Sequence, residues 1–76
     1  MALVKRFSEL IRERNSVHGI VECTYTAFED DGQRYLQLDT YGSAERQVPN
    51  KVSQSIQLDA ASAGELRRII DRIFSH

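Results

Sequence analysis

Two strand-like runs joined by an Asp-Gly dipeptide constrain the fold of this 76-residue chain more than any other feature. The second run, QRYLQLDTY at 33–41, alternates apolar and polar residues along most of its length. The first run, HGIVECTYTAF at 18–28, is rich in the β-branched and aromatic residues that strands favour. Because Asp-Gly between such runs favours a tight turn, the sequence predicts an antiparallel hairpin that turns at Asp31-Gly32.

A third strand is predicted at about 51–58, where Val52, Ile56 and Leu58 alternate with serine and glutamine. The loop before it contains ERQV, which is a candidate fourth strand. In these strands the apolar residues fall on one face, as in an antiparallel sheet with one packed face and one wet face. The predicted polar face carries Tyr35, Gln37, Asp39, Tyr41, Ser53, Ser55 and Gln57.

Apolar residues at helical spacing flank the predicted sheet on both sides. The first stripe is Leu3, Val4, Phe7, Leu10 and Ile11. It predicts an amphipathic helix over 1–15. Asp59 is a good N-cap for a second helix over 60–75. The whole chain, 1–76, is then one α+β domain: an N-terminal helix, a three- to four-stranded antiparallel sheet over 18–58, and a C-terminal helix covering one sheet face.

The length of the chain favours an oligomer. At this size only about 60% of the unfolded surface can be buried by folding alone. The second helix carries a broad apolar stripe, and twofold dimers are the commonest oligomers. We therefore expect a homodimer through the stripe residues. These are Leu66, Ile69, Ile70, Ile73 and Phe74.

No combination of residues in the sequence predicts catalysis. Cys23 is the only cysteine, so no intrachain disulfide is possible, and the two histidines are too far apart in sequence for a metal motif. The acidic run at 29–31 fits a solvated turn. Ser53 and Ser55 lack a neighbouring histidine and the glycines of a nucleophile elbow. We therefore expect no enzymatic activity, no cofactor and no metal.

Two segment types are also missing from the sequence. No apolar run approaches 18 residues, and no signal-peptide pattern is present. The expected location is therefore the cytoplasm, without a membrane contact.

The polar face has two interpretations. Antiparallel sheets often show one polar side to water without any binding role. Alternatively, tyrosine rings can stack on bases, hydroxyl and amide groups can bond phosphates or base edges, and cations at the rim can follow a backbone. This second interpretation predicts a single-stranded DNA or RNA site. Its residues are Arg34, Tyr35, Gln37, Tyr41, Arg46, Lys51, Ser53, Ser55 and Gln57.

Charge favours a different partner. The formal net charge is −1, whereas nucleic-acid-binding domains are usually basic, and Asp39 lies on the predicted polar face. The alternative function is therefore a protein–protein adaptor or regulator, bacterial or phage-encoded, that binds no nucleic acid.

From Phe28 onward the chain resembles the single-stranded-DNA-binding domain of the transcriptional positive coactivator four family and its bacterial relatives. The matching pieces are the middle strand RYLQLDTY, the loop and turn ERQVPNK, the last strand and cap SIQLD, and the helix segment ELRRII. The resemblance implies transcription regulation, a homodimer through the helices, and a sheet face that binds melted DNA without strict sequence preference.

A second resemblance concerns the segment YLQLDTYGS…VPNKVSQSIQ. It is similar to a group of short bacterial proteins that carry a methionyl-tRNA formyltransferase label. This chain has neither the length nor the folate-site chemistry for that reaction.

Overall fold

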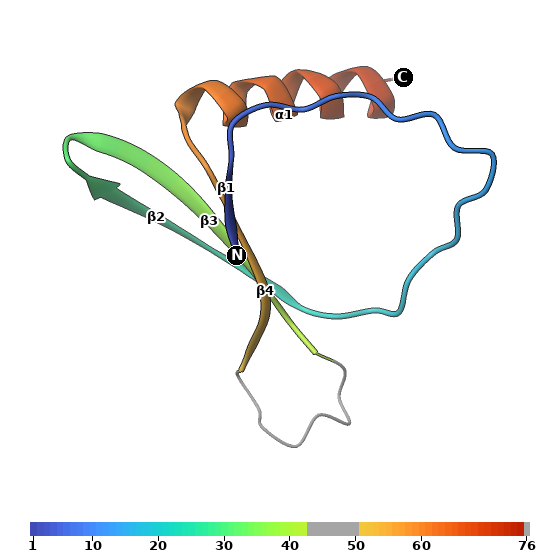
Figure 1. Cartoon of the computed structure of the whole chain (residues 1–76), viewed down its shortest axis with the longest axis horizontal. Coiled ribbons are helices and arrows are strands. Elements are labelled where there is room, and N and C mark those ends of the chain that lie inside the picture. Colours follow the sequence, from blue (N-terminus) through green and yellow to red (C-terminus); the bar gives the residue numbers. More distant parts are fainter. Residues whose placement is uncertain (43–50, 76) are drawn as a thin grey trace.

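A computed structural model describes residues 1–42 and 51–75 of the chain. Over these ranges, four strands form one sheet and a single helix follows the last strand (Figure 1). The elements are β1 (Ala2–Val4), β2 (Cys23–Asp30), β3 (Gln33–Tyr41), β4 (Val52–Leu58) and α1 (Ala60–Phe74). The strand order across the sheet is β1-β4-β3-β2.

The hairpin that the Asp-Gly dipeptide predicts is present as β2 and β3. Asp30 pairs with Gln33, so a two-residue turn connects the strands. Asp31 and Gly32 both have positive φ angles, 52° and 75°. A turn with two positive φ angles matches the right-handed twist of the strands that it joins, and glycine adopts this backbone conformation readily. This turn fixes which residues of β2 and β3 lie opposite one another.

The N-terminal helix predicted over 1–15 is wrong. Ala2–Val4 form strand β1 instead, and the following residues 5–22, which we call the N-terminal arm, contain neither helix nor strand. Most of the stability of a short helix in a protein comes from packing of its apolar face. Leu10 and Ile11 of the predicted stripe are 69% and 87% exposed, so this stripe is not packed against the sheet.

The expectation of an entirely antiparallel sheet is also wrong. Strand β1 runs parallel to β4, with Leu3 opposite Gln57, whereas the other pairs are antiparallel. The edge of β4 offers unpaired backbone groups, and β1 satisfies some of them. The first long strand starts at Cys23 rather than at His18. The segment ERQV, the candidate fourth strand, lies outside the described residues.

The C-terminal helix is present as α1, but it does not cover one sheet face as predicted. Residues 62–66 are buried or half-buried, and most of its second half is exposed. Figure 1 shows α1 extending from the end of β4 away from the β2–β3 hairpin. Ser62 in its first turn is 1% exposed, and Leu58 just before it is 2% exposed. The small core therefore lies where β4 meets the start of α1.

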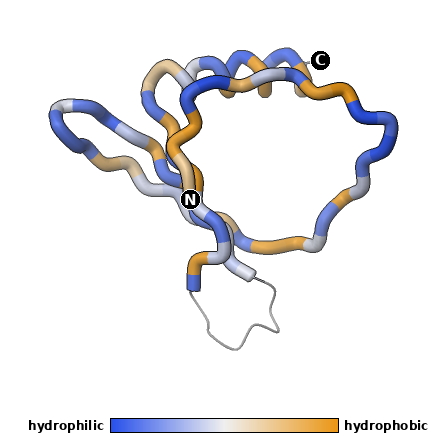
Figure 2. Tube along the Cα trace, in the orientation of Figure 1, coloured by the Kyte–Doolittle hydropathy of each residue, from blue (hydrophilic) through white to orange (hydrophobic). Residues whose placement is uncertain are grey.

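The molecule is open for its size. Its radius of gyration is 14.8 Å, against about 11 Å for a compact domain of this length. Its accessible surface is 7138 Å², against about 4700 Å² for a folded monomer of the same mass. Hydrophobic positions recur along both the N-terminal arm and α1 (Figure 2). The single chain thus leaves a large apolar surface in contact with solvent.

Candidate functional site

The polar face predicted from the alternating pattern exists on β2, β3 and β4. Gln37 lies opposite Thr26 on one side and Gln57 on the other, and Asp39 lies opposite Ser55. Paired residues of neighbouring strands share a face of the sheet, so these side chains form a continuous polar surface. The register shifts between Thr40 and Tyr41, so Ser53 is an extra residue in β4.

A chain of side-chain hydrogen bonds crosses the middle of this face. The Gln37 amide Nε2 donates to both carboxylate oxygens of Asp39, each at 3.1 Å. The Gln57 amide Nε2 donates to Gln37 Oε1 at 2.9 Å. We call these three residues the amide chain. It holds the two glutamine side chains in one arrangement, and Asp39 is its acceptor end.

Aromatic rings lie beside the amide chain. Phe28 and Tyr35 are stacked, with ring centroids 5.4 Å apart and ring planes inclined by 25°. Both are half-buried, so part of the pair contacts solvent. Tyr41 is half-buried too, and its hydroxyl shares a 3.0 Å hydrogen bond with Thr24 Oγ1. Sequence analysis missed Phe28 as a site residue, although the Asp-Gly turn places it opposite Tyr35.

A hollow of about 310 Å³ lies at the edge of the polar face. Its lining residues are Met1, Ala2, Leu3, Gln37, Ser55 and Gln57. Ser55 is only 8% exposed, and its hydroxyl makes no hydrogen bond within the described part of the chain. Sequence analysis missed Leu3 here, because the apolar spacing around it indicated a helix rather than a strand beside β4.

The predicted cations do not gather on one surface. Arg34 precedes Tyr35 in β3 and therefore points to the opposite face, where Arg34 Nη2 lies 3.9 Å from the Glu29 carboxylate. Lys51 is exposed immediately before β4. Arg46 lies outside the described residues. Among the predicted basic residues with described positions, only Lys51 remains a candidate cation for the rim of the polar face.

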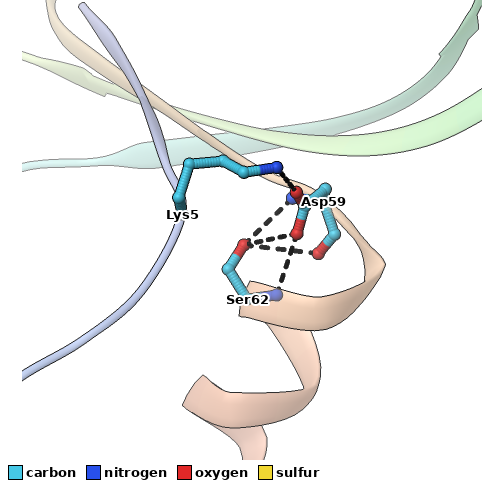
Figure 3. Close-up of polar contacts among 3 residues, drawn as sticks. All are labelled: Lys5, Asp59 and Ser62. Atoms are coloured by element: carbon cyan, nitrogen blue, oxygen red, sulfur yellow. Dashed lines mark hydrogen bonds and ion pairs between the residues drawn. The ribbon is translucent and has the colours of Figure 1, made fainter.

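An ion pair joins the N-terminal arm to the start of α1. Lys5 Nζ donates to Asp59, whose carboxylate also accepts the backbone N–H of Ser62 at 2.9 Å (Figure 3). The Ser62 hydroxyl in turn accepts the Asp59 N–H at 3.0 Å, which completes a capping box. The hydrogen bonds from Lys5 and Ser62 lower the pKa of Asp59 to about 2. The same contact with Asp59 raises the pKa of Lys5.

A second contact fixes the start of the N-terminal arm. The backbone N–H of Phe7 donates to Glu65 Oε1 at 2.6 Å, and Phe7 is half-buried. Lys5 therefore attaches to the N-cap of α1, and Phe7 attaches to Glu65 within the helix. Beyond Phe7 the arm is exposed, and its apolar side chains include Val17 and Ile20 at 100% and 97% exposure.

The predicted dimer residues differ in their exposure. Leu66 and Ile69 are half-buried. Ile70, Ile73 and Phe74 are 45%, 64% and 69% exposed. On the sheet face opposite the polar one, Tyr25 is 78% exposed and Ile56 is 38% exposed. These residues leave the outer half of α1 and part of the apolar sheet face uncovered.

Neither a membrane-spanning helix nor a cluster of three metal-ligating side chains occurs in the ranges 1–42 and 51–75. Cys23 is a free, exposed thiol. The chain matches no protein family, and no curated protein or solved structure shows significant similarity to it.

Proposed function

We propose that this chain is a small homodimeric protein that binds single-stranded nucleic acid on the polar face of its sheet. The observation that carries the proposal is the combination on one face of a stacked aromatic pair and an ordered amide chain. Single-strand binders need flat rings for the bases and polar groups for the edges and backbone. The resemblance of the chain from Phe28 onward to the positive coactivator four family implies a protein of this kind.

The aromatic pair supplies the stacking surface. Phe28 and Tyr35 are stacked on each other, so each ring helps to fix the orientation of the other. Stacking of one base on an aromatic side chain contributes about 1–3 kcal/mol and depends little on the base. Tyr41, held by Thr24, is a third ring and gives the proposed surface a second stacking position. A strand that stacks both on the aromatic pair and on Tyr41 would cross the amide chain of β3 and β4.

The rim supplies the charge in this proposal. Lys51 is exposed beside β4, and Arg46 precedes it in the sequence, outside the described residues. Arg34 is not part of the proposed surface, because it points to the opposite face and faces Glu29. With a net charge of −1, we expect a weak dependence of affinity on salt, with only one or two phosphate contacts per chain.

The homodimer is supported by the uncovered apolar surface. The molecule exposes far more area than a folded monomer of its mass, and the excess is larger than the roughly 800 Å² that each partner buries in a standard interface. Ile70, Ile73 and Phe74 form the uncovered stripe of α1. A second copy that packs on this stripe would bury the apolar side chains and leave the polar face free.

The exposed thiol of Cys23 is consistent with the proposed location in the reducing cytoplasm.

Nucleic-acid binding is tested by titrating labelled oligo-dT at several salt concentrations. The double variant Tyr35→Ala with Lys51→Ala should lose roughly tenfold or more in affinity, because a stacking surface and a cation are removed together. Tyr25→Ala is the matched control, since Tyr25 is exposed on the opposite face. Absence of binding at low salt, or equal affinity of the double variant and the wild type, contradicts the proposal.

The dimer is tested by sedimentation equilibrium. Ile73→Glu places a charge in the exposed stripe of α1 and should shift the protein from dimer to monomer. Ile11→Glu in the N-terminal arm is the control, because Ile11 is exposed outside the proposed interface. A wild-type protein that sediments as a monomer at every concentration excludes the proposed dimer.

A second candidate function is that of a protein–protein adaptor. It is favoured by the N-terminal arm, in which Ile11, Val17 and Ile20 are nearly fully exposed. Exposed apolar side chains of this kind often mark a protein–protein interaction site, where a bound partner removes them from water. The adaptor would be supported by one stoichiometric partner protein in a pull-down that loses this partner on Val17→Ser with Ile20→Ser and contains no nucleic acid. Unchanged recovery of the partner by that variant counts against the arm as the docking segment.

A further inference from the structure

We infer that the hollow beside β1 holds one base of the bound strand and selects bases that carry an exocyclic amino group. This inference rests on the proposed function and names the chemistry that the polar face recognises. Three observations carry it: the polarity of the amide chain, the buried hydroxyl of Ser55, and the apolar wall that β1 adds.

The first observation is that the amide chain has a fixed direction. The Asp39 carboxylate only accepts hydrogen bonds, so Gln37 must turn its Nε2 toward Asp39. Gln37 therefore offers Oε1 to its neighbour, and Gln57 must turn its own Nε2 toward Gln37. The Oε1 of Gln57 is then the free end of the chain, and it accepts no hydrogen bond among the described residues. Asp39 thus makes Gln57 Oε1, the last group of the amide chain, a hydrogen-bond acceptor.

The second observation is a buried polar group that has no partner among residues 1–42 and 51–75. Ser55 is 8% exposed and lines the same hollow as Gln57, yet its hydroxyl makes no hydrogen bond within the described ranges. A buried hydroxyl that lacks a partner costs free energy, and native structures usually satisfy such groups. A ligand in the hollow would complete its hydrogen bonding. Ser55 both donates and accepts, so it can serve either a ring nitrogen or a carbonyl group.

The third observation is the apolar wall. Strand β1 pairs with β4 so that Leu3 lies opposite Gln57 and on its face of the sheet. Met1 and Leu3 line the hollow together with Gln37, Ser55 and Gln57. Its volume, about 310 Å³, is at the lower end of the range for small-ligand pockets. A hollow with an apolar wall and polar groups at one side suits a flat ring whose edge carries the hydrogen-bonding groups.

The chemistry of the bases then gives the preference. Cytosine and adenine present an amino donor next to a ring nitrogen that accepts. The amino group complements Gln57 Oε1, and the ring nitrogen complements the Ser55 hydroxyl. Thymine and uracil have no amino group, and their N3–H donor lies between two carbonyl oxygens. In the ring position that lets cytosine contact both Gln57 and Ser55, O4 of either base meets the acceptor at Gln57, so we expect both bases to bind less tightly in that position.

The test compares oligodeoxycytidylate with oligodeoxyuridylate of the same length, because these bases differ only at position 4 and at the N3 proton. The wild-type protein should bind the cytosine strand about five- to tenfold more tightly, the effect of one good hydrogen bond. The variant Asp39→Asn should bring this ratio close to one, because asparagine can donate to Gln37 and let both glutamine amides reverse. The variant Gln57→Leu should abolish the preference by removing the acceptor.

Gln54→Leu is the matched control, since Gln54 is an exposed glutamine of the same strand and lies opposite Thr40 rather than in the hollow. It should keep the cytosine preference, and circular dichroism should show that every variant is folded. Equal affinity of the wild-type protein for both strands overturns the inference and leaves the proposed function standing. Absence of binding to either strand overturns both. A preference that survives Asp39→Asn overturns the directional role of Asp39.

Discussion

The N-terminal arm and helix α1 both carry apolar residues at helical spacing, yet only α1 is a helix. Two local features separate them. Asp59 and Ser62 form a capping box at the start of α1, and Leu58, the last residue of β4, is buried just before this cap. The arm follows β1, and Lys5 and Phe7 serve as contacts to α1 rather than as a helix start. An amphipathic stripe therefore becomes a helix here where a cap and a buried anchor hold its first turn.

The largest expected effect comes from truncating the buried Leu58 side chain. Leu58→Ala deletes the most buried apolar side chain and should lower the free energy of unfolding by about 2–5 kcal/mol. Val17→Ala, at a fully exposed position of the arm, should change it by less than about 0.5 kcal/mol. Urea denaturation followed by circular dichroism measures both. Similar losses for the two variants would mean that the arm is packed in solution.

A pair of proline substitutions tests directly whether α1 is a helix and the N-terminal arm is not. Proline in the interior of α1, as Arg68→Pro, removes a helical hydrogen bond and should cost about 3 kcal/mol or more. Glu9→Pro in the arm, where the structure has no helix, should cost well under 1 kcal/mol. The measurement is the same denaturation midpoint. A large loss for Glu9→Pro would show that the arm is helical in solution.

A smaller effect is expected at the cap. Asp59→Ala should lower the Tm by about 4–8 °C, the usual effect of a lost N-cap in a small domain. Asp59→Asn keeps a capping oxygen and should lower the Tm less. The variant Asp59→Asn also tests how much the charge of Asp59 contributes to stability, because the pKa of Asp59 falls from 3.8 to about 2 on folding.

The sign of the pH dependence follows from this shift. A carboxyl whose pKa is lowered by folding stabilises the fold fully above its ordinary pKa, and the stabilisation disappears as the pH falls toward about 2. Wild-type Tm should therefore drop between about pH 4 and pH 2 more steeply than the Tm of Asp59→Asn. Parallel curves for the two proteins would contradict a role for the Lys5–Asp59 pair.

Local patterns predicted the central part of the fold. Asp31-Gly32 gave the turn, the alternation in 33–41 gave the two faces of β3, and Asp59 gave the start of α1. These features depend on neighbouring residues, which the sequence displays directly. The same alternation gave the polar face with Gln37 and Gln57 across from one another.

Features that depend on contacts between residues far apart in the sequence could not be predicted in the same way. Leu3 and Val4 fit either a helix or a short strand, and the decision depends on the free edge of β4, which is more than 50 residues away. The position of Arg34 away from Tyr35 follows from strand alternation, but its proximity to Glu29 depends on the hairpin register. The hollow requires β1 beside β4, so no local sequence pattern indicates it.

The proposed role of the polar face is tested most directly by the side-chain amide resonances of the glutamines. In spectra recorded during titration with a single-stranded oligonucleotide, the amide signals of Gln37 and Gln57 should shift, because both lie on the proposed surface. The amide signal of Gln54, opposite Thr40, should stay in place. Shifts confined to Gln54 and to residues of α1, or no shift at saturating oligonucleotide, would contradict binding on this face.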